Sequence, residues 1–317
     1  STNPALDYEQ NVVVSNLMPD MSVIDFLNGV VKMFNLIIEY DDSTPNIESY
    51  KLLEYGSYYS SGSEVDFNTF IDTSSITITQ PTRYNTFSLK YKDSEQFNSK
   101  VFKGVFGREY GELRESFSSD VKGEFKLEIP FEIPYMDVLG TSGSYFPVFF
   151  CQSDSVYDGT TGDSESYYGA PVVFNISGEK ITLTDGVSII DDTGSGNEIT
   201  SLFYFGLLDR FDLSSVNSLG FAADGSLHPS SNTYIEPTTN GGNDLHTQYA
   251  NYWEDTLNRV ANPRVRMLEV QGSIDVSKVA NISLDSLIRF GEGLYTIDSA
   301  NINLLTGLFK IKLLTRL

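Results

Sequence analysis

The sequence contains one cysteine and only two histidines in 317 residues. A single cysteine excludes an internal disulfide framework, and we interpret Cys151 as a small structural residue. The histidines, His228 and His246, belong to no metal-binding signature. A serine nucleophile would need a histidine base oriented by an acid, and no such set is visible. The sequence therefore predicts no catalytic residue, no cofactor and no metal site.

Basic side chains are also scarce, with 21 lysines and arginines against 43 aspartates and glutamates and a net charge of −22. A surface that binds nucleic acid or an anionic membrane needs the opposite sign. No apolar run approaches the roughly 20 residues of a membrane helix, and the start lacks the pattern of a secretory signal. We therefore expect no specific nucleic-acid binding and no membrane partner. The loop-like start at Ser1, without methionine, leads us to expect a piece of a longer chain.

Aromatic residues, in contrast, are frequent, with 19 tyrosines and 21 phenylalanines. Most of them lie in short alternating runs bounded by Gly, Asn, Asp or Ser, a pattern that favours antiparallel β-structure. The sequence predicts an α+β fold, mainly antiparallel β, with two β-rich, barrel-like domains that each carry a packing helix. The expected divisions are an N-terminal α+β domain at 1–139, a Gly/Ser/Asp-rich insertion or long-looped segment at 140–200, and a β-rich domain at 201–317.

A helix followed at once by a strand is predicted near the N-terminus. Ser22 and Asp25 resemble a capping box, Asn35 tolerates the left-handed conformation that ends helices, and the β-rich run 36–40 follows. The apolar residues between them recur with helical spacing and predict one buried face: Val23, Phe26, Leu27, Val30, Val31 and Phe34.

Several shorter elements are predicted between residues 50 and 135. A β-meander would use residues 50–56, 75–81 and 86–92. A short helix at 93–107 would bury Phe97, Val101 and Val105. The clearest alternation predicts a strand at 123–135, whose apolar face comprises Phe125, Leu127, Ile129, Phe131 and Ile133. Pro130 and Pro134 lie on the other face and suit an edge position or a bulge.

The last third predicts a helix and a set of strands. Residues 243–260 place Leu245, Tyr249, Trp253 and Leu257 at i+4 spacing, with Asn243 or Asp244 as the cap. We expect Tyr249, Trp253 and Leu257 to lie in the core of the C-terminal domain. After Pro263, strands are predicted at 264–274, 286–290, 294–299 and 308–317, with glycine turns at 291–293 and 305–307.

The residue types leave three kinds of site to consider: a calcium site, a sugar-binding site and a glycan-hydrolase site. Two acidic loops could offer oxygen ligands to calcium, although neither matches an EF-hand: Asp154, Asp158, Asp163 and Glu165, and Asp191, Asp192 and Glu198. Paired tyrosines could stack on sugars, although packing is the more ordinary role: Tyr58, Tyr59, Tyr167 and Tyr168. A glycan hydrolase would need two placed carboxylates, and no pair can be chosen among 43 acids.

Five stretches together resemble a known family. They are "NLMPDMSVIDFLNGVVKMFNLIIE" (16–39), "YYSSGSEVDFNTFID" (58–72), "LKYKDSEQFNSKVFKGVFGREYG" (89–111), "LHTQYANYWEDTLNRVANPRVRMLEVQGSI" (245–274) and "LIRFGEGLYTIDSANINLLTGLFKIKLLTRL" (287–317). In combination they resemble tail and baseplate-hub proteins of tailed bacteriophages, especially those infecting Bacteroidota. The resemblance spares residues 140–201.

This resemblance implies a structural protein of the virion tail, and not an enzyme. Its expected partners are copies of itself in a ring that continues the tail tube and lets DNA pass, together with tail tube and tail tip or fibre proteins. A receptor- or carbohydrate-binding tail module and an acidic glycan hydrolase are the alternatives. Carboxylates lining such a ring would let phosphates pass without sticking.

Overall fold

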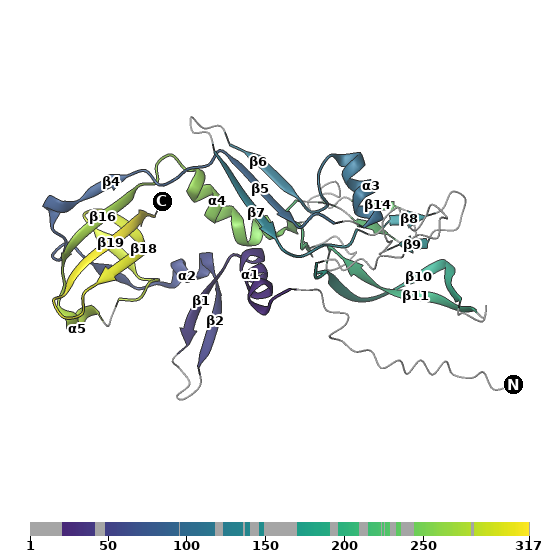
Figure 1. Cartoon of the computed structure of the whole chain (residues 1–317), viewed down its shortest axis with the longest axis horizontal. Coiled ribbons are helices and arrows are strands. Elements are labelled where there is room, and N and C mark those ends of the chain that lie inside the picture. Colours follow the sequence, from purple (N-terminus) through teal and green to yellow (C-terminus); the bar gives the residue numbers. More distant parts are fainter. Residues whose placement is uncertain are drawn as a thin grey trace.

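The structure is a computed structural model that describes residues 21–41, 48–94, 96–117, 123–135, 137–139, 146–148, 170–190, 196–208, 215–222, 224, 226–228, 233–235, 244–279 and 282–316. It is a mixed α+β protein with mainly antiparallel sheets, so the predicted fold class is confirmed. No sheet closes into a barrel within these residues. Figure 1 shows the main sheets spread along the long axis of the molecule.

A six-stranded sheet forms one end of the molecule, in the order β3-β17-β18-β19-β16-β4. Its strands are β3 (Glu64–Asp66), β17 (Leu287–Phe290), β18 (Gly293–Ile302), β19 (Leu308–Thr315), β16 (Met267–Ser273) and β4 (Thr77–Thr79). A 3-10 turn (Thr73–Ser75) and α5 (Val276–Val279) adjoin it. Its core contains Phe67, Val270, Ile288 and Leu313, all fully buried. We call this sheet with its core the six-stranded lobe.

The predicted C-terminal hairpins are present in this lobe. Gly291 and Gly307 have φ values of 60° and 70°, in the left-handed region that glycine adopts without a Cβ penalty. They form the turns between β17 and β18 and between β18 and β19, and both strand pairs are antiparallel. The predicted meander is wrong, because β4 pairs with β16 and not with its sequence neighbours. The edge strand β4 thus pairs with a strand far away in the sequence in preference to the strands next to it in the sequence.

A three-stranded sheet, in the order β6-β5-β7, lies nearer the middle of the molecule. The strands are β6 (Leu113–Ser116), β5 (Thr86–Tyr91) and β7 (Glu124–Ile129). Helices α1 (Val23–Met33), α3 (Phe97–Phe106) and α4 (Glu254–Ala261) contribute to its hydrophobic cluster. We call this sheet with its cluster the three-stranded lobe. The expected edge position of β7 and its buried face are confirmed, because Leu127 and Ile129 are buried.

Helix α1 begins and ends where the sequence predicts. The Ser22 hydroxyl accepts a hydrogen bond from the Asp25 amide at 3.1 Å, and Asn35 has a φ of 47°. Its buried residues are Gly29 and Met33, whereas Val23 and Phe26 at the N-terminal end of the predicted stripe are exposed. A Cβ on Gly29 would lie 2.5 Å from the Phe131 ring, so glycine lets the helix approach the end of β7 closely.

Two further helix predictions need correction. In α3 the buried residues that the structure describes are Ser99 and Phe102, while Val101 and Val105 are exposed, because the helix turns a different face towards Tyr110 and Tyr135. The side chain of Phe97 lies outside the described residues. The predicted helix at 243–260 begins later. Residues Asp244–His246 form β15, which pairs in parallel with β12 (Ser215–Asn217), and a π-helical turn at Tyr249–Trp253 then leads into α4.

Trp253 also lies in a different core from the one expected. Trp253 and Leu257 pack in the three-stranded lobe with residues such as Phe87 and Phe125, not in a core made from residues 201–317. The Trp253 indole nitrogen donates to the Lys32 carbonyl at 3.2 Å. The domain boundaries at 139/140 and 200/201 stay predictions, but both clusters combine residues from each end of the chain.

Two-stranded units complete the described fold. The hairpin of β1 (Leu36–Asp41) and β2 (Ser49–Glu54) projects from the body beside α1 and α2 (Tyr55–Ser61) (Figure 1). The other pairs are β8 (Asp137–Leu139) with β9 (Phe146–Val148), β10 (Asn175–Ile190) with β11 (Gly196–Gly206), and β13 (Ser226–His228) with β14 (Thr233–Ile235). No helix in the described residues is long and apolar enough to cross a membrane.

Candidate functional site

A cavity of about 380 Å³ lies where α2, α4 and the six-stranded sheet meet. Helix α2 contributes Tyr55 and Tyr59, α4 contributes Asp255 and Arg259, and the chain beyond β19 contributes Arg316. Uncharged polar side chains of Ser60, Thr256, Asn258, Asn262 and Thr296 complete most of its wall. The lining therefore combines two cations with several groups that can donate or accept hydrogen bonds.

Arg259 is the central side chain of this cavity. Its guanidinium carbon lies 4.9 Å from the centre of the Tyr55 ring and 5.8 Å from that of Tyr59, and it donates a hydrogen bond to the Tyr55 hydroxyl. Such cation–π contacts stabilise a partly desolvated cation without neutralising it. Arg259 is thus held in place by two aromatic rings while its positive charge persists.

Arg316 lies beside it and is exposed, with its Nη1 donating to the Tyr59 carbonyl at 3.4 Å. Burial, together with the nearby Arg316 charge, lowers the pKa of Arg259. Burial and the Asp298 carboxylate raise the pKa of Tyr59. The cavity therefore holds two neighbouring cations that repel one another. The carboxylates of Asp255 and Asp298 nearby partly offset their positive charge.

A second hollow of about 330 Å³ adjoins the first and shares Tyr55 and Asp255 with it. It extends along α2 towards Phe34 and Tyr252, whose rings meet edge-on at 5.3 Å. The segment after α1 is fixed here, because the Asn35 side-chain amide donates to the Tyr252 carbonyl at 2.7 Å. Both hollows thus follow the line where α2 packs on α4.

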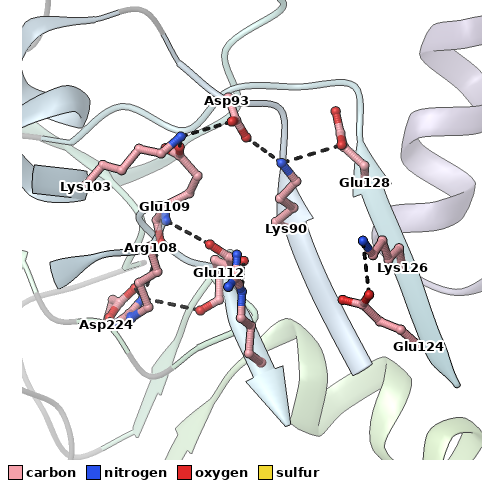
Figure 2. Close-up of polar contacts among 11 residues, drawn as sticks. Lys90, Asp93, Lys103, Arg108, Glu109, Glu112, Glu124, Lys126, Glu128 and Asp224 are labelled. Carbon is pink, nitrogen blue, oxygen red and sulfur yellow. Dashed lines mark hydrogen bonds and ion pairs between the residues drawn. The ribbon is translucent and has the colours of Figure 1, made fainter. Parts of the chain in front are cut away.

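Buried acids in the three-stranded lobe form a separate polar network (Figure 2). The Asp224 carboxylate is almost fully buried, forms a two-pronged pair with Arg108 and accepts from the Gly111 amide at 2.7 Å. The Glu112 carboxylate accepts from the Glu109 amide at 2.9 Å and pairs with Arg114. The bonds of Asp224 join sequence-distant segments and those of Glu112 fix the local turn, so we interpret the inner network as structural.

Lysines and acids extend this network outward. Figure 2 shows the Asp93 carboxylate between two lysines, with Lys90 Nζ at 2.5 Å and Lys103 Nζ at 3.1 Å. The hydrogen bond from Lys90 lowers the pKa of Asp93. Burial raises the pKa of the Glu109 carboxyl, although the ion pair with Lys103 opposes that effect. Each of these two acids is thus held in an ion pair by a lysine.

A fourth buried acid, Glu132, has no exposed surface. Its Oε2 accepts from the Ser94 hydroxyl at 2.7 Å, and its Oε1 accepts from the Ala170 amide at 3.0 Å. Gln96 adds a longer contact of 3.4 Å. Glu132 therefore ties the end of β7 to the segments before α3 and after residue 169. Composition alone could not single out Glu132 or Asp224, because their hydrogen-bond partners lie far away in the sequence.

The structure describes only some residues of the predicted sites. Tyr58 is buried, which raises its pKa to about 12 and removes it as a platform for sugars, whereas Tyr59 lines the cavity. His228 ends β13 and His246 ends β15, and no group of three metal-ligating side chains occurs in the described part of the chain. Outside the described residues lie Cys151, Asp154, Asp158, Asp163, Glu165, Tyr167, Tyr168, Asp191 and Asp192. Glu198 lies on β11.

The projecting hairpin exposes an apolar face. Because Ile38 pairs with Leu52 and Tyr40 with Tyr50, all four side chains lie on one side of the ribbon. Their exposed fractions are 44%, 47%, 57% and 65%, in that order. We call these four residues the hairpin face. The opposite side carries Glu39 and Lys51 as a cross-strand pair beside Ile37 and Leu53, and these two apolar side chains are half-buried, so the exposed apolar residues of the hairpin lie on the hairpin face.

A second exposed apolar group lies at the far turn of the six-stranded lobe. Leu304, Leu305 and Leu308 are 63%, 94% and 58% exposed around the turn between β18 and β19. The turn backbone is well ordered by hydrogen bonds, since the Asn303 side chain accepts from the Leu305 amide at 2.9 Å. We call these three residues the leucine turn.

Comparisons with known proteins add no identity to these features. No model of a known protein family matches the chain, and no curated protein matches it.

Proposed function

We propose that this protein is a structural subunit of a bacteriophage tail or baseplate hub, and that its copies form a ring that continues the tail tube. The observation that carries the proposal is the hairpin face, which a projecting two-stranded ribbon leaves open to solvent. Isolated hairpins are at best marginally stable in water, and exposed apolar patches mark interaction surfaces. A neighbouring subunit would cover this face.

The leucine turn supplies a second and different surface on the same chain. The hairpin face adjoins α1 and α2, while the leucine turn lies in the six-stranded lobe (Figure 1). When two unlike patches of identical subunits meet head to tail, rotation from copy to copy generates a ring if it closes. We propose that the hairpin face of one copy meets the leucine turn of the next.

The net charge of −22 also favours this interpretation. Acidic copies repel one another, so association needs apolar contacts strong enough to overcome that repulsion. Carboxylates concentrated on an inner wall would keep passing DNA from sticking. In the virion, tail tube and tail tip or fibre proteins would adjoin the ring. The five stretches similar to tail and hub proteins support the same assignment.

A double substitution tests the interface. Tyr40→Ser with Tyr50→Ser removes two aromatic side chains from the hairpin face without opening a buried core. We expect the wild-type chain to form a defined oligomer by mass photometry, and the variant to need at least about tenfold higher concentration, because burying aromatic side chains contributes several kcal/mol.

Glu39→Ser, on the opposite side of the same ribbon, is the matched control and should assemble like the wild type. A wild-type chain that stays monomeric up to millimolar concentration would contradict the proposal. Equal losses in the double variant and the control would contradict the assignment to the hairpin face.

A further inference from the structure

The cavity between α2, α4 and the six-stranded sheet has a charge opposite to that of the protein as a whole. The chain has twice as many acids as bases, and three other arginines pair with carboxylates, namely Arg108, Arg114 and Arg289. Within the described residues, no carboxylate lies within ion-pair distance of Arg259 or Arg316. Both open into the same cavity.

We propose that this cavity is a binding site for a carboxylate group. Arginine presents its donors in a planar fork that matches the two oxygens of a carboxylate. The Tyr55 and Tyr59 rings fix the Arg259 guanidinium in position, which reduces the entropy lost on binding. Arg316, exposed and held by one long side-chain hydrogen bond, supplies a second cation to the same ligand.

The size and polarity of the cavity favour a ligand larger than a simple ion. Its volume of about 380 Å³ lies within the range of small-ligand sites, roughly 300–1,000 Å³. Asn258, Asn262 and Thr296 offer uncharged hydrogen-bonding groups to the rest of the ligand. The cavity therefore fits an acidic side chain with its adjoining peptide groups, or a free carboxylic acid of similar size.

Carboxylate is favoured over phosphate by the acids nearby. Asp255 lines the cavity, and Asp298 lies close enough to raise the pKa of Tyr59, although burial is the larger cause. Arg259, Arg316 and Asp255 give the wall a formal charge of +1 (two cations less one anion), which a carboxylate monoanion neutralises and a phosphate dianion exceeds. The proposal stands on the cavity and its two arginines, and it does not rest on the proposed ring.

Ligand-observed NMR on the full chain tests this site with three probes. They are the amide of N-acetyl-aspartate, its neutral asparagine counterpart and inorganic phosphate. We expect the aspartate probe to bind at least about tenfold more tightly than either of the others, because hydrogen bonds to charged groups are the stronger ones. Arg316→Gln should weaken aspartate binding about tenfold, and it should leave folding unchanged because the side chain is exposed.

Arg264→Gln is the matched control, since it removes the same charge outside the cavity, and it should bind like the wild type. Equal affinity for the aspartate and asparagine probes, tighter phosphate binding, or equal weakening in both variants would overturn the proposal.

A second measurement identifies the source of the carboxylate. If it belongs to another copy of this chain, the aspartate probe and Arg316→Gln should each lower the oligomeric fraction in mass photometry. If it belongs to a free acid, the probe should bind and leave the oligomeric fraction unchanged. Either result is consistent with a carboxylate site, and only the binding experiment can overturn the proposal of that site. A failure of the ring proposal can therefore be distinguished from a failure of the site proposal.

Discussion

The six-stranded and three-stranded lobes are stabilised in different ways. The six-stranded lobe alternates apolar and polar residues, and its ion pairs, such as Arg289 with Glu64, lie in solvent. The three-stranded lobe buries the carboxylates of Glu132 and Asp224 and satisfies them with long-range hydrogen bonds. The first lobe thus follows from strand patterning, whereas the second depends on polar contacts between distant segments.

This difference explains which parts of the fold could be predicted. Glycine turns and period-2 alternation are local signals, so β17, β18 and β19 were predicted close to their observed bounds. The helix expected at 243–260 failed at its start because strand pairing with β12 captured Asp244–His246. Such pairing depends on a partner strand that the local sequence pattern cannot predict.

The candidate site was still harder to predict. Tyr59 was singled out as one of a tyrosine pair, yet its companion Tyr58 turned out to be buried. The pairing of Arg259 with Arg316 could not be predicted from the sequence, because the two residues lie far apart in it. They line the same cavity only when α4 packs beside the end of β19. A scarcity of arginines in an acidic chain was the one signal available.

The largest expected effect is a loss of stability in the three-stranded lobe that leaves the six-stranded lobe intact. Trp253→Ala should lower the free energy of unfolding by about 3–5 kcal/mol, because it removes a buried indole and leaves a cavity. Hydrogen exchange should show lost protection in β5 and β7, with β18 and β19 unaffected. Equal loss in both sheets would show that the lobes unfold as one unit, and an unchanged stability would contradict the buried position of Trp253.

The next effect compares similar ion pairs in the two lobes. Arg108→Ala leaves the Asp224 carboxylate buried without its main cation and should cost about 3–5 kcal/mol in chemical denaturation. Arg289→Ala, which breaks the exposed pair with Glu64, should leave stability nearly unchanged. Comparable losses in the two variants would contradict the distinction between the lobes.

The smallest effect is a pH dependence at Glu109. Its pKa in the folded protein is raised above 4.5 mainly by burial, so the protonated form favours folding and its contribution is lost as pH rises through the folded pKa. We expect Glu109→Gln, which does not titrate, to gain stability relative to the wild type as the pH rises from 4.5 through the raised pKa of Glu109. Thermal melts of both proteins across this range provide the check, and a difference that moves the opposite way would show that the Lys103 ion pair dominates.

The central claim is that copies of this chain form a ring through the hairpin face and the leucine turn. Electron microscopy of the purified 317-residue chain, at a concentration where mass photometry detects oligomers, tests it most directly. The account predicts closed rings in which the hairpin face of each copy contacts the leucine turn of the next, with carboxylates concentrated on the inner wall. Oligomers that leave both apolar surfaces in solvent would contradict the claim, and a neutral or basic inner wall would contradict the passage of DNA.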